Sequence, residues 1–269
     1  MYSNYGLIGK PLSHSLSPII HNYFINITSI NGGYCCFEID HTQIKDIVGI
    51  FKMFNFKGFN VTLPYKQVIM DYLDDIDEIA KKISAVNTVR IDCGRLIGYN
   101  TDINGIDETF KYYNVEINNK EILIIGAGGG CRGLLQYLKN FNYKSLSLMN
   151  RDVDKARILV SEIGIKNIDI IDINSFDNCK KYDIIINTTS AGLTGESYIE
   201  FSALNSEVAF DMQYSLTGST YFLDRVKSFV KIDGLLMLIG QAYHAFMIWN
   251  NIRFTLDYSN LLKRLRGIR

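Results

Sequence analysis

The sequence has no surplus of charge of either sign. Lys plus Arg and Asp plus Glu both total 28, which gives a formal net charge of +0. A chain without a net positive field has no general attraction for nucleic acid or for an anionic membrane surface. We therefore expect no nucleic-acid partner and no membrane partner, and any anionic ligand must be bound by local groups.

Long apolar runs are also missing. No run approaches the roughly 20 residues that a membrane-spanning helix needs. The first residues, Met-Tyr-Ser-Asn-Tyr, lack the basic and apolar zones of a signal peptide. We expect the protein to stay in the cytoplasm.

Cysteine and histidine are few and scattered. The five cysteines are odd in number and form no CxxC pair, and the four histidines show no metal-ligand spacing. This pattern predicts a reducing compartment, no structural metal, and thiols that are mostly buried. The cysteines are Cys35, Cys36, Cys93, Cys131 and Cys179.

The length and composition predict two globular domains. The 269 residues exceed one core of average size, and 47% hydrophobic with 21% charged residues is ordinary for an enzyme. A loop rich in asparagine, residues 114–120, precedes a very apolar strand, residues 121–125. We place the domain boundary near Asp102.

That apolar strand runs directly into a glycine-rich loop. An apolar run without polar alternation suits a parallel strand buried on both faces, and residues 134, 135 and 138 then follow at helical spacing. Gly126 permits a sharp turn, and Gly128 lets the backbone approach a pyrophosphate at the start of the helix. The alternative is close helix-to-strand packing without a ligand.

Polar residues recur at predicted strand ends in the first half. Three hydroxyls alternate in residues 13–17, where they could converge on a small anion or form a solvated turn that caps the helix at Ser17. The strand beginning at Gly58 ends near Asn60, Thr62 and Lys66, and the carboxyl edge of such a sheet is where ligands bind. Considered without its neighbours, Lys66 would be interpreted as an ordinary solvated lysine on the protein surface.

The remaining first half predicts a charged helix at residues 74–82 and a β-hairpin of residues 86–89 and 96–99. Asp102, at the end of Asn100-Thr101-Asp102, either caps the next helix, residues 103–113, or contributes to a site.

In the second half, the end of the strand at residues 145–149 bears on cofactor choice. An acidic residue there favours NAD, whereas an arginine accommodates the extra phosphate of NADP. Arg151 is suitably placed, and Asp152 would oppose the phosphate unless it caps the helix at residues 153–163. Further strands are expected at 168–171, 182–186 and 207–211, a long helix at 236–249, and a final helix at 257–265.

In chain order, these motifs resemble the shikimate dehydrogenase family over nearly the whole sequence. The residues that carry the resemblance are 13–18, 60–66, 85–88, 98–105, the glycine loop, 150–151, 187–190, 211–214 and 237–242. The resemblance implies reversible, NADPH-dependent reduction of 3-dehydroshikimate to shikimate, a step of the shikimate pathway of aromatic amino acid and chorismate biosynthesis.

The resemblance also implies a domain arrangement. The fold is α/β, with an amino-terminal α/β substrate domain of residues 1–102, completed by 240–269. A Rossmann-type NADP-binding domain occupies residues 103–239, and the active site is expected in the cleft between the two. The resemblance leaves open whether the protein is a monomer or a homodimer.

Site roles follow from the resemblance position by position. Lys66 and Asp102 would carry out the proton chemistry, which suits lysine because hydride arriving at a carbonyl carbon leaves an alkoxide that needs a positive charge and a proton. Ser15 and Ser17 would bind the substrate carboxylate, Asn60, Thr62, Asn87, Asp102 and Gln241 its ring hydroxyls, and Tyr214 would lie near the carboxylate and the nicotinamide. The cofactor would contact Gly126, Ala127, Gly128, Gly129, Gly130, Asn150, Arg151, Thr188, Thr189, Ser190, Met212 and Gly234.

Three departures from the family pattern bear on details. Ser215-Leu216 replaces an asparagine-proline pair, Asp152 replaces a frequent threonine, and Gly130 and Cys131 replace alanine or serine types. Two alternatives therefore stay open. One is a quinate and shikimate dehydrogenase that accepts NAD, which Asp152 favours. The other is a catalytically silent ligand-sensing domain, which would not need Lys66.

Overall fold

The chain forms two compact units, each with its own six-stranded sheet. The computed structural model describes residues 2–175, 180–193 and 199–267. The first unit is Met1–Gly105 with Leu238–Leu256, and the second is Ile106–Met237 with Asp257–Arg269. The expected α/β fold class, with a Rossmann-like second sheet, is confirmed.

The sheet of the first unit is mixed, in the order β2-β1-β3-β5-β6-β4. Strands β2, β1 and β3 are parallel, whereas β3, β5 and β6 are antiparallel neighbours, so the predicted hairpin is confirmed. The strands are β1 (Ser3–Gly9), β2 (Gly32–Glu38), β3 (Phe56–Val61), β4 (Asp75–Ile76), β5 (Thr88–Asp92) and β6 (Arg95–Tyr99).

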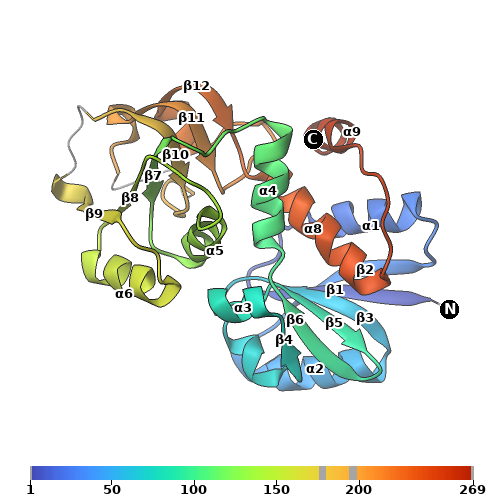
Figure 1. The fold of residues 1–269 in the computed structure, drawn as a ribbon. Helices are drawn as coiled ribbons and strands as arrows, with labels where there is room; N and C mark the ends of the chain where they lie inside the picture. Colours follow the sequence, from blue (N-terminus) through green and yellow to red (C-terminus); the bar gives the residue numbers. More distant parts are fainter. Residues whose placement is uncertain (1, 176–179, 194–198, 268–269) are drawn as a thin grey trace. The chain divides into compact units, whose positions relative to one another are not determined.

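Helices cover both faces of this sheet. Helices α1 (Ser17–Ile27) and α8 (Leu235–Asn250) lie over one face, and α2 (Ile44–Met53) lies over the other (Figure 1). The short helix α3 (Glu78–Ile83) and the 3₁₀ turns η1 (His41–Gln43) and η2 (Val68–Tyr72) complete the unit.

Strand β3 shows why the two faces differ in chemistry. Because side chains alternate along a strand, Phe59 and Val61 join the apolar cluster under α2 that contains Phe51, whereas Asn60 points to the face under α8. On that face the indole of Trp249 donates to the carbonyl oxygen of Val89 at 2.9 Å. This packing places Asn60 in a buried, partly polar layer.

The second unit has an all-parallel sheet in the order β12-β11-β10-β7-β8-β9. With β7 as its first strand, this is the order of a dinucleotide-binding fold, and ligands bind where the order reverses, between β7 and β10. The strands are β7 (Glu121–Ile125), β8 (Ser145–Asn150), β9 (Ile168–Asp172), β10 (Tyr182–Asn187), β11 (Asn205–Asp211) and β12 (Lys227–Ile232).

The second unit also contains helices before, between and after these strands. They are α4 (Asp102–Tyr112), whose first residues belong to the first unit, α5 (Gly129–Leu138), α6 (Val153–Ile163), α7 (Tyr221–Arg225) and α9 (Tyr258–Gly267), with 3₁₀ turns η3 (Ile173–Ser175) and η4 (Phe201–Ala203). No helix in the described part of the chain combines the length and apolar character needed to cross a membrane.

The final helix differs from its expected place. Residues 240–269 were assigned to the first domain, but α9 packs with the second unit. Its buried leucines, Leu261, Leu262 and Leu265, form an apolar stripe, and Arg266 pairs with the buried Asp233 at 3.0 Å. A buried carboxylate needs such a partner, which ties α9 to this unit.

Other local expectations are corrected. The charged helix expected at 74–82 begins only at Glu78, because Asp75–Ile76 pair with β6 as β4. Ser17 is the first residue of α1 and not its cap, which is Leu16. Strand β12 and helix α7 were not predicted, and β12 is an edge strand whose residues are mostly exposed.

The expectation of buried thiols holds for Cys131 and is wrong for Cys35 and Cys93, which are exposed. Cys93 occupies the turn of the β5–β6 hairpin, at φ +49°. Cys36 is partly buried, and Cys179 lies outside the described residues.

Candidate functional site

Lys66 and Asp102 form the centre of the candidate site in the first unit. Lys66 follows β3 and Asp102 begins α4, so two separate chain turns deliver the two charges. The ammonium Nζ lies 2.6 Å from Asp102 Oδ2, and the two side chains are 27% and 20% exposed. The pair is partly desolvated and can still be reached by a ligand.

Asn87 holds the other carboxylate oxygen. Its Nδ2 donates to Asp102 Oδ1 at 2.8 Å, while its own Oδ1 accepts the backbone N–H of Thr101 at 2.8 Å. Asn100 Oδ1 in turn accepts the N–H of Asp102 at 3.0 Å. Asp102 therefore has a fixed orientation, with one oxygen on an amide and the other on an ammonium.

Asn60 is joined to the same network but is only 4% exposed. Its Nδ2 donates to the backbone oxygen of Asn87 and to Thr88 Oγ1, both at 3.1 Å, and its Oδ1 accepts from the Tyr34 hydroxyl at 2.9 Å. Both amide hydrogens are thus engaged within the protein. At most one lone pair of Oδ1 remains for a ligand.

The two predicted carboxylate-binding serines lie together at the start of α1. The N–H of Ser17 donates to Ser15 Oγ at 3.3 Å, and Ser17 is 6% exposed. Thr62 directly follows β3, and Gln241 lies on α8, where its Nε2 donates to the Leu238 oxygen at 3.0 Å. Neither Thr62 nor Gln241 is hydrogen-bonded to the Lys66 network among the described residues.

The predicted cofactor loop lies in the second unit, between β7 and α5. Gly126 has φ +97°, and a Cβ there would lie 2.4 Å from Thr189 Cγ2, so only glycine fits. Ala127 follows, and then Gly128, Gly129 and Gly130 are exposed. At Gly128 and Gly129 a Cβ would meet nothing within 4 Å. The start of α5 therefore offers free N–H groups and open space, which suits a phosphate group.

The end of β8 resolves the ambiguity of Asp152. Its carboxylate accepts the N–H of Lys155 at 2.9 Å and caps α6, and Asn150 Nδ2 donates to the Asp152 backbone oxygen at 2.6 Å. The acidic side chain is therefore bound to its own helix. Arg151 is exposed beside it, so the surface at this strand end can present a guanidinium.

The end of β10 faces the same loop. Thr188 Oγ1 donates to the backbone oxygens of Ile125 and Gly126 at 2.9 and 3.1 Å, and the N–H and hydroxyl of Thr189 both bond to Asn187 Oδ1. Ser190 follows and is exposed. These bonds hold β10 against β7 at the point where the strand order reverses.

Met212 and Gly234 meet beyond the end of β11. A Cβ on Gly234 would lie 2.3 Å from the Met212 backbone oxygen, and the Gly234 N–H donates to the Gln213 oxygen at 2.8 Å. Tyr214 follows in the same segment of the second unit. Gly234 is thus required by packing, whether or not it also contacts a cofactor.

Replacing Gly234 with alanine should lower the free energy of unfolding of the second unit by about 1–3 kcal/mol, because an added methyl group collides with backbone. Urea denaturation followed by circular dichroism measures this loss. Gly133→Ala is the matched control, since a Cβ there meets nothing within 4 Å and alanine favours the helix. Equal stability of the two variants would contradict the packing requirement.

Asp211 is a buried carboxylate in the second unit. Burial raises its pKa to about 6, while hydrogen bonds from Thr220, Gln213 and Asn187 oppose the rise. Its two oxygens hold the loop after β11 and the end of β10 together. Its role is therefore to order the strand ends that flank the predicted cofactor loop.

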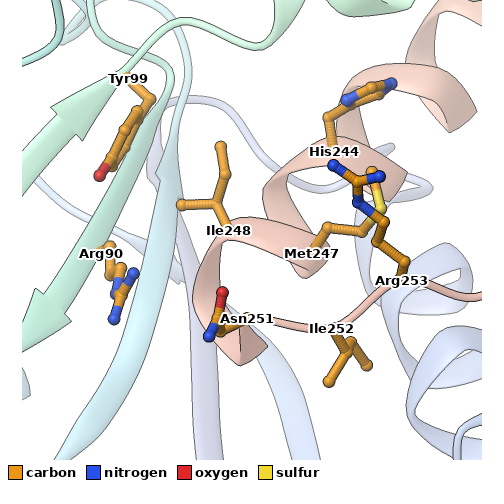
Figure 2. A pocket seen from close by; sticks show the side chains of 8 residues that line it. All are labelled: Arg90, Tyr99, His244, Met247, Ile248, Asn251, Ile252 and Arg253. Atoms are coloured by element: carbon orange, nitrogen blue, oxygen red, sulfur yellow. The ribbon is translucent and has the colours of Figure 1, made fainter.

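A separate cavity of about 400 Å³ lies in the first unit, between the β5–β6 hairpin and the end of α8 (Figure 2). It is lined by Arg90, Tyr99, His244, Met247, Ile248, Asn251, Ile252 and Arg253. None of the predicted site residues is among them.

Among the described residues, no group of three His, Cys, Asp or Glu side chains could hold a metal ion.

Several residues of the Lys66 network were not singled out from the sequence. Tyr34 and Thr101 enter it through hydrogen bonds, and Thr88 lies within a motif but had no role. The available signal was the repeated Asn-Thr pair at residues 87–88 and 100–101. Nothing in the sequence near Tyr34 marks it.

Comparison with known families gives a related match for each half of the chain. Residues 7–89 match the family described as "Shikimate dehydrogenase substrate binding domain". Residues 109–203 match the family described as "Shikimate / quinate 5-dehydrogenase". The two matches follow each other in chain order and fall on the two units.

Curated relatives agree over almost their full lengths. The chain is 39% identical over 257 residues to "Shikimate dehydrogenase (NADP(+))" of Methanococcus maripaludis, covering 92% of both chains. It is 38% identical to the protein of the same name from Clostridium botulinum, covering 93% of this chain and 96% of the relative.

Solved structures show the same similarity. The shikimate 5-dehydrogenase of Thermus thermophilus in complex with NADP(H) and shikimate has a TM-score of 0.84 at 26% identity, and 98% of both chains is covered. The enzyme of Listeria monocytogenes, in complex with shikimate and NAD, has a TM-score of 0.83 at 29% identity, covering 98% of this chain and 96% of that one.

Proposed function

The chain belongs to the shikimate dehydrogenase family, and from this membership we propose that it interconverts shikimate and 3-dehydroshikimate with NADP, using Lys66 and Asp102 to move the proton. The reaction is a reversible oxidoreduction of a secondary alcohol. The observation that supports these roles is the Lys66–Asp102 contact of 2.6 Å beside a buried network of amides and hydroxyls.

Two parts of the second unit would hold NADP. The N–H groups at the start of α5 suit the pyrophosphate, because the glycines there are exposed and leave space for it. Arg151 would bind the additional phosphate on the adenosine ribose. When bound, the nicotinamide would supply the hydride acceptor for alcohol oxidation and, in its reduced form, the hydride donor for the ketone.

The proton chemistry is assigned to the first unit. As the alcohol is oxidised its hydroxyl must lose a proton, and in the reverse direction the oxygen must gain one. In the reduction the Lys66 ammonium can donate a proton to the substrate oxygen and become the neutral amine, and in the oxidation the lone pair of the neutral amine accepts the proton from the hydroxyl. Asp102 orients the ammonium from 2.6 Å, and Asn87 keeps Asp102 in place from its other oxygen.

Substrate recognition is assigned to polar groups around this pair. Ser15 and Ser17, joined at the start of α1, would bind the carboxylate. Asn87, Thr62 and Gln241 would bind ring hydroxyls. Tyr214, which follows β11, is assigned the role that the family resemblance implies, a position near the substrate carboxylate and the nicotinamide.

The assay that tests the proposal follows absorbance of the reduced nicotinamide with shikimate or quinate as substrate and NADP or NAD as cofactor. Rapid reduction of NADP by shikimate is expected. Preference for quinate with NAD would support the alternative of a dual enzyme. Asp152 was the feature that favoured NAD, and its bond to Lys155 N–H weakens that argument.

Arg151→Ala should raise the KM for NADP by about tenfold or more while changing the KM for NAD by less than about twofold, because a phosphate contact with arginine is charge-assisted. Steady-state kinetics with both cofactors measures this. Arg157→Ala, on the exposed side of α6 beside Asp154, is the matched control and should change neither value. Equal weakening of both cofactors by Arg151→Ala would contradict the assignment.

A catalytically silent sensor on this fold is the second candidate. Such a protein would need a ligand site but no lysine and carboxylate in contact, and this chain has both. Turnover of shikimate by the purified protein, without an added partner, would exclude it. We further propose a cytoplasmic location, which suits the exposed thiols of Cys35 and Cys93, and either a monomer or a homodimer.

A further inference from the structure

Tyr34 lies at the far end of the network that leads to Lys66. It is only 2% exposed, and its ring stacks on His21 with centroids 4.2 Å apart and planes 6° from parallel. Its hydroxyl donates to Asn60 Oδ1 at 2.9 Å. Burial raises the pKa of Tyr34 well above its ordinary value, so the phenol remains a hydrogen-bond donor.

The Asn87 backbone oxygen, which can only accept, determines which way the Asn60 amide faces, and the bond that Tyr34 donates to Oδ1 stabilises the same orientation. With Oδ1 turned towards the phenol, both hydrogens of Nδ2 point away from it, one to Thr88 Oγ1 and one to the Asn87 backbone oxygen, each at 3.1 Å. A flipped amide would place its oxygen against the Asn87 backbone oxygen, which cannot donate, and would lose the bond that Tyr34 donates to Oδ1.

Thr88 passes the same direction on. Because its oxygen accepts from Asn60, its single proton is available to Asn87 Oδ1, 2.9 Å away, while the Thr101 hydroxyl, 3.0 Å from Thr88, can donate to the Thr88 oxygen. The same Asn87 oxygen accepts the Thr101 N–H. Asn87 must then present Nδ2, and not oxygen, to Asp102 Oδ1.

We propose that Tyr34, Asn60 and Thr88 are positioning residues that hold the Asn87 amide, and through it the Asp102 carboxylate, in the orientation that Lys66 requires. This inference rests on the proposed function, in which Lys66 and Asp102 carry out the proton chemistry. Asn60 acts within this chain of hydrogen bonds through both hydrogens of Nδ2 and through Oδ1.

The cost of burying these groups supports a role beyond folding. Tyr34, Asn60, Asn87 and Thr88 are each less than 5% exposed. Replacing both partners of such a buried hydrogen bond by apolar groups is often nearly neutral for stability, so stability alone does not require this chain of polar groups. Asn60 lies on strand β3, and its neighbours on the opposite face of that strand, Phe59 and Val61, are apolar. The polar side chains occur on the face that leads to Asp102.

The test compares Thr88→Val, which removes the hydroxyl at nearly constant shape, with Thr88→Ser, which keeps it. In shikimate oxidation with NADP, kcat should be about tenfold lower for Thr88→Val and within about twofold of wild type for Thr88→Ser. A tenfold change is the size expected for losing one hydrogen bond to Asn87, the residue that holds the charged Asp102. Tyr34→Phe, at the remote end, should lower kcat about threefold.

Tyr5→Phe is the matched control for Tyr34→Phe. The Tyr5 hydroxyl also donates to an asparagine oxygen, that of Asn250, within the same unit, and Tyr5 is 1% exposed. Both changes remove one buried phenol donor. Only Tyr34→Phe should change kcat, while thermal unfolding shows comparable stability losses.

A double-mutant cycle separates positioning from a general effect on the fold. In an Asp102→Asn background, where the carboxylate to be positioned is gone, Thr88→Val should change the remaining kcat by less than about twofold. A full tenfold loss in that background, or wild-type kcat in Thr88→Val, would overturn the inference. If Thr88→Val does not fold, Tyr34→Phe in both backgrounds decides in the same way. Absence of shikimate turnover in the wild-type protein would instead overturn the proposed function.

Discussion

Lys66→Ala is expected to lower kcat for shikimate oxidation by about two orders of magnitude or more, the range for losing a general acid-base group. The reason is that no other described ammonium or imidazole contacts the Asp102 carboxylate, so neither proton exchange with the substrate oxygen nor the positive charge beside it would be retained. Steady-state kinetics with saturating NADP measures the loss. Circular dichroism should show an unchanged fold, because the side chain is 27% exposed.

Lys10→Ala is the matched control for this experiment. Lys10 Nζ also lies 2.6 Å from an aspartate oxygen, that of Asp40, but both side chains are about half exposed or more. Removing this exposed pair should leave kcat within about twofold of wild type. Similar kcat for Lys66→Ala and the wild-type protein would disprove the catalytic role of Lys66.

The stability of the first unit is expected to fall as the pH drops below about 6.5, the pKa of an unperturbed histidine. His21 is fully buried, and neither ring nitrogen has a hydrogen-bond partner in the described chain. Burial lowers its pKa to about 3 in the folded protein, and the nearby Asn60 side chain opposes this only in part. Between these two values the unfolded chain binds a proton that the folded chain does not, so acid favours unfolding.

The size of this stability loss follows from the difference between the pKa of His21 in the unfolded and in the folded chain. Each pH unit between 6.5 and the lowered pKa is worth about 1.4 kcal/mol, so His21 should cost the first unit about 3 kcal/mol by pH 4.

In the second unit Asp211 acts in the opposite direction. Its pKa is raised to about 6, so the folded form binds the additional proton and stability falls as pH rises from about 4 to 6.

The single tryptophan allows the first unit to be followed alone. Trp249 belongs to that unit, and its ring centroid lies 5.1 Å from that of His21. Urea denaturation followed by tryptophan fluorescence at pH 7 and pH 4 should show the loss in the wild-type protein and a much smaller loss in His21→Phe, which cannot be protonated. The same pH dependence in both proteins would refute the assignment to His21.

Much of the fold was predictable because the responsible patterns are local. The apolar run before Gly126 predicted β7, and the glycine turn at residues 93–94 predicted the β5–β6 hairpin. Helix α6 has its expected bounds, Val153–Ile163, because an aspartate cap precedes it and a left-handed glycine, Gly164, follows it.

The remaining errors concern features that depend on distant parts of the chain. Strand β12 is an edge strand with little burial, so its sequence shows no clear alternation. The place of α9 depends on Arg266 meeting Asp233, 33 residues away. Only the folded arrangement determines such a pairing.

The candidate site shows the same division. The sequence indicates Lys66, Asn87 and Asp102 as site residues, and the structure joins them by hydrogen bonds. Their catalytic and binding roles remain predictions. The sequence does not indicate Tyr34 as a site residue, because its link to Asn60 comes from the pairing of β1 with both β2 and β3.

The packing of Trp249 bears on how the protein emerges from the ribosome. The first unit uses residues from both ends of the chain, and the indole lies against Gly58, where a Cβ would come within 2.2 Å of the ring, and beside Tyr5. The part of the amino-terminal sheet that α8 covers therefore stays uncovered until residue 249 has been translated, while α1 already lies over the rest of that face. A nascent chain stalled at the end of β6 would present that uncovered part to chaperones, and release of the finished chain would bury it.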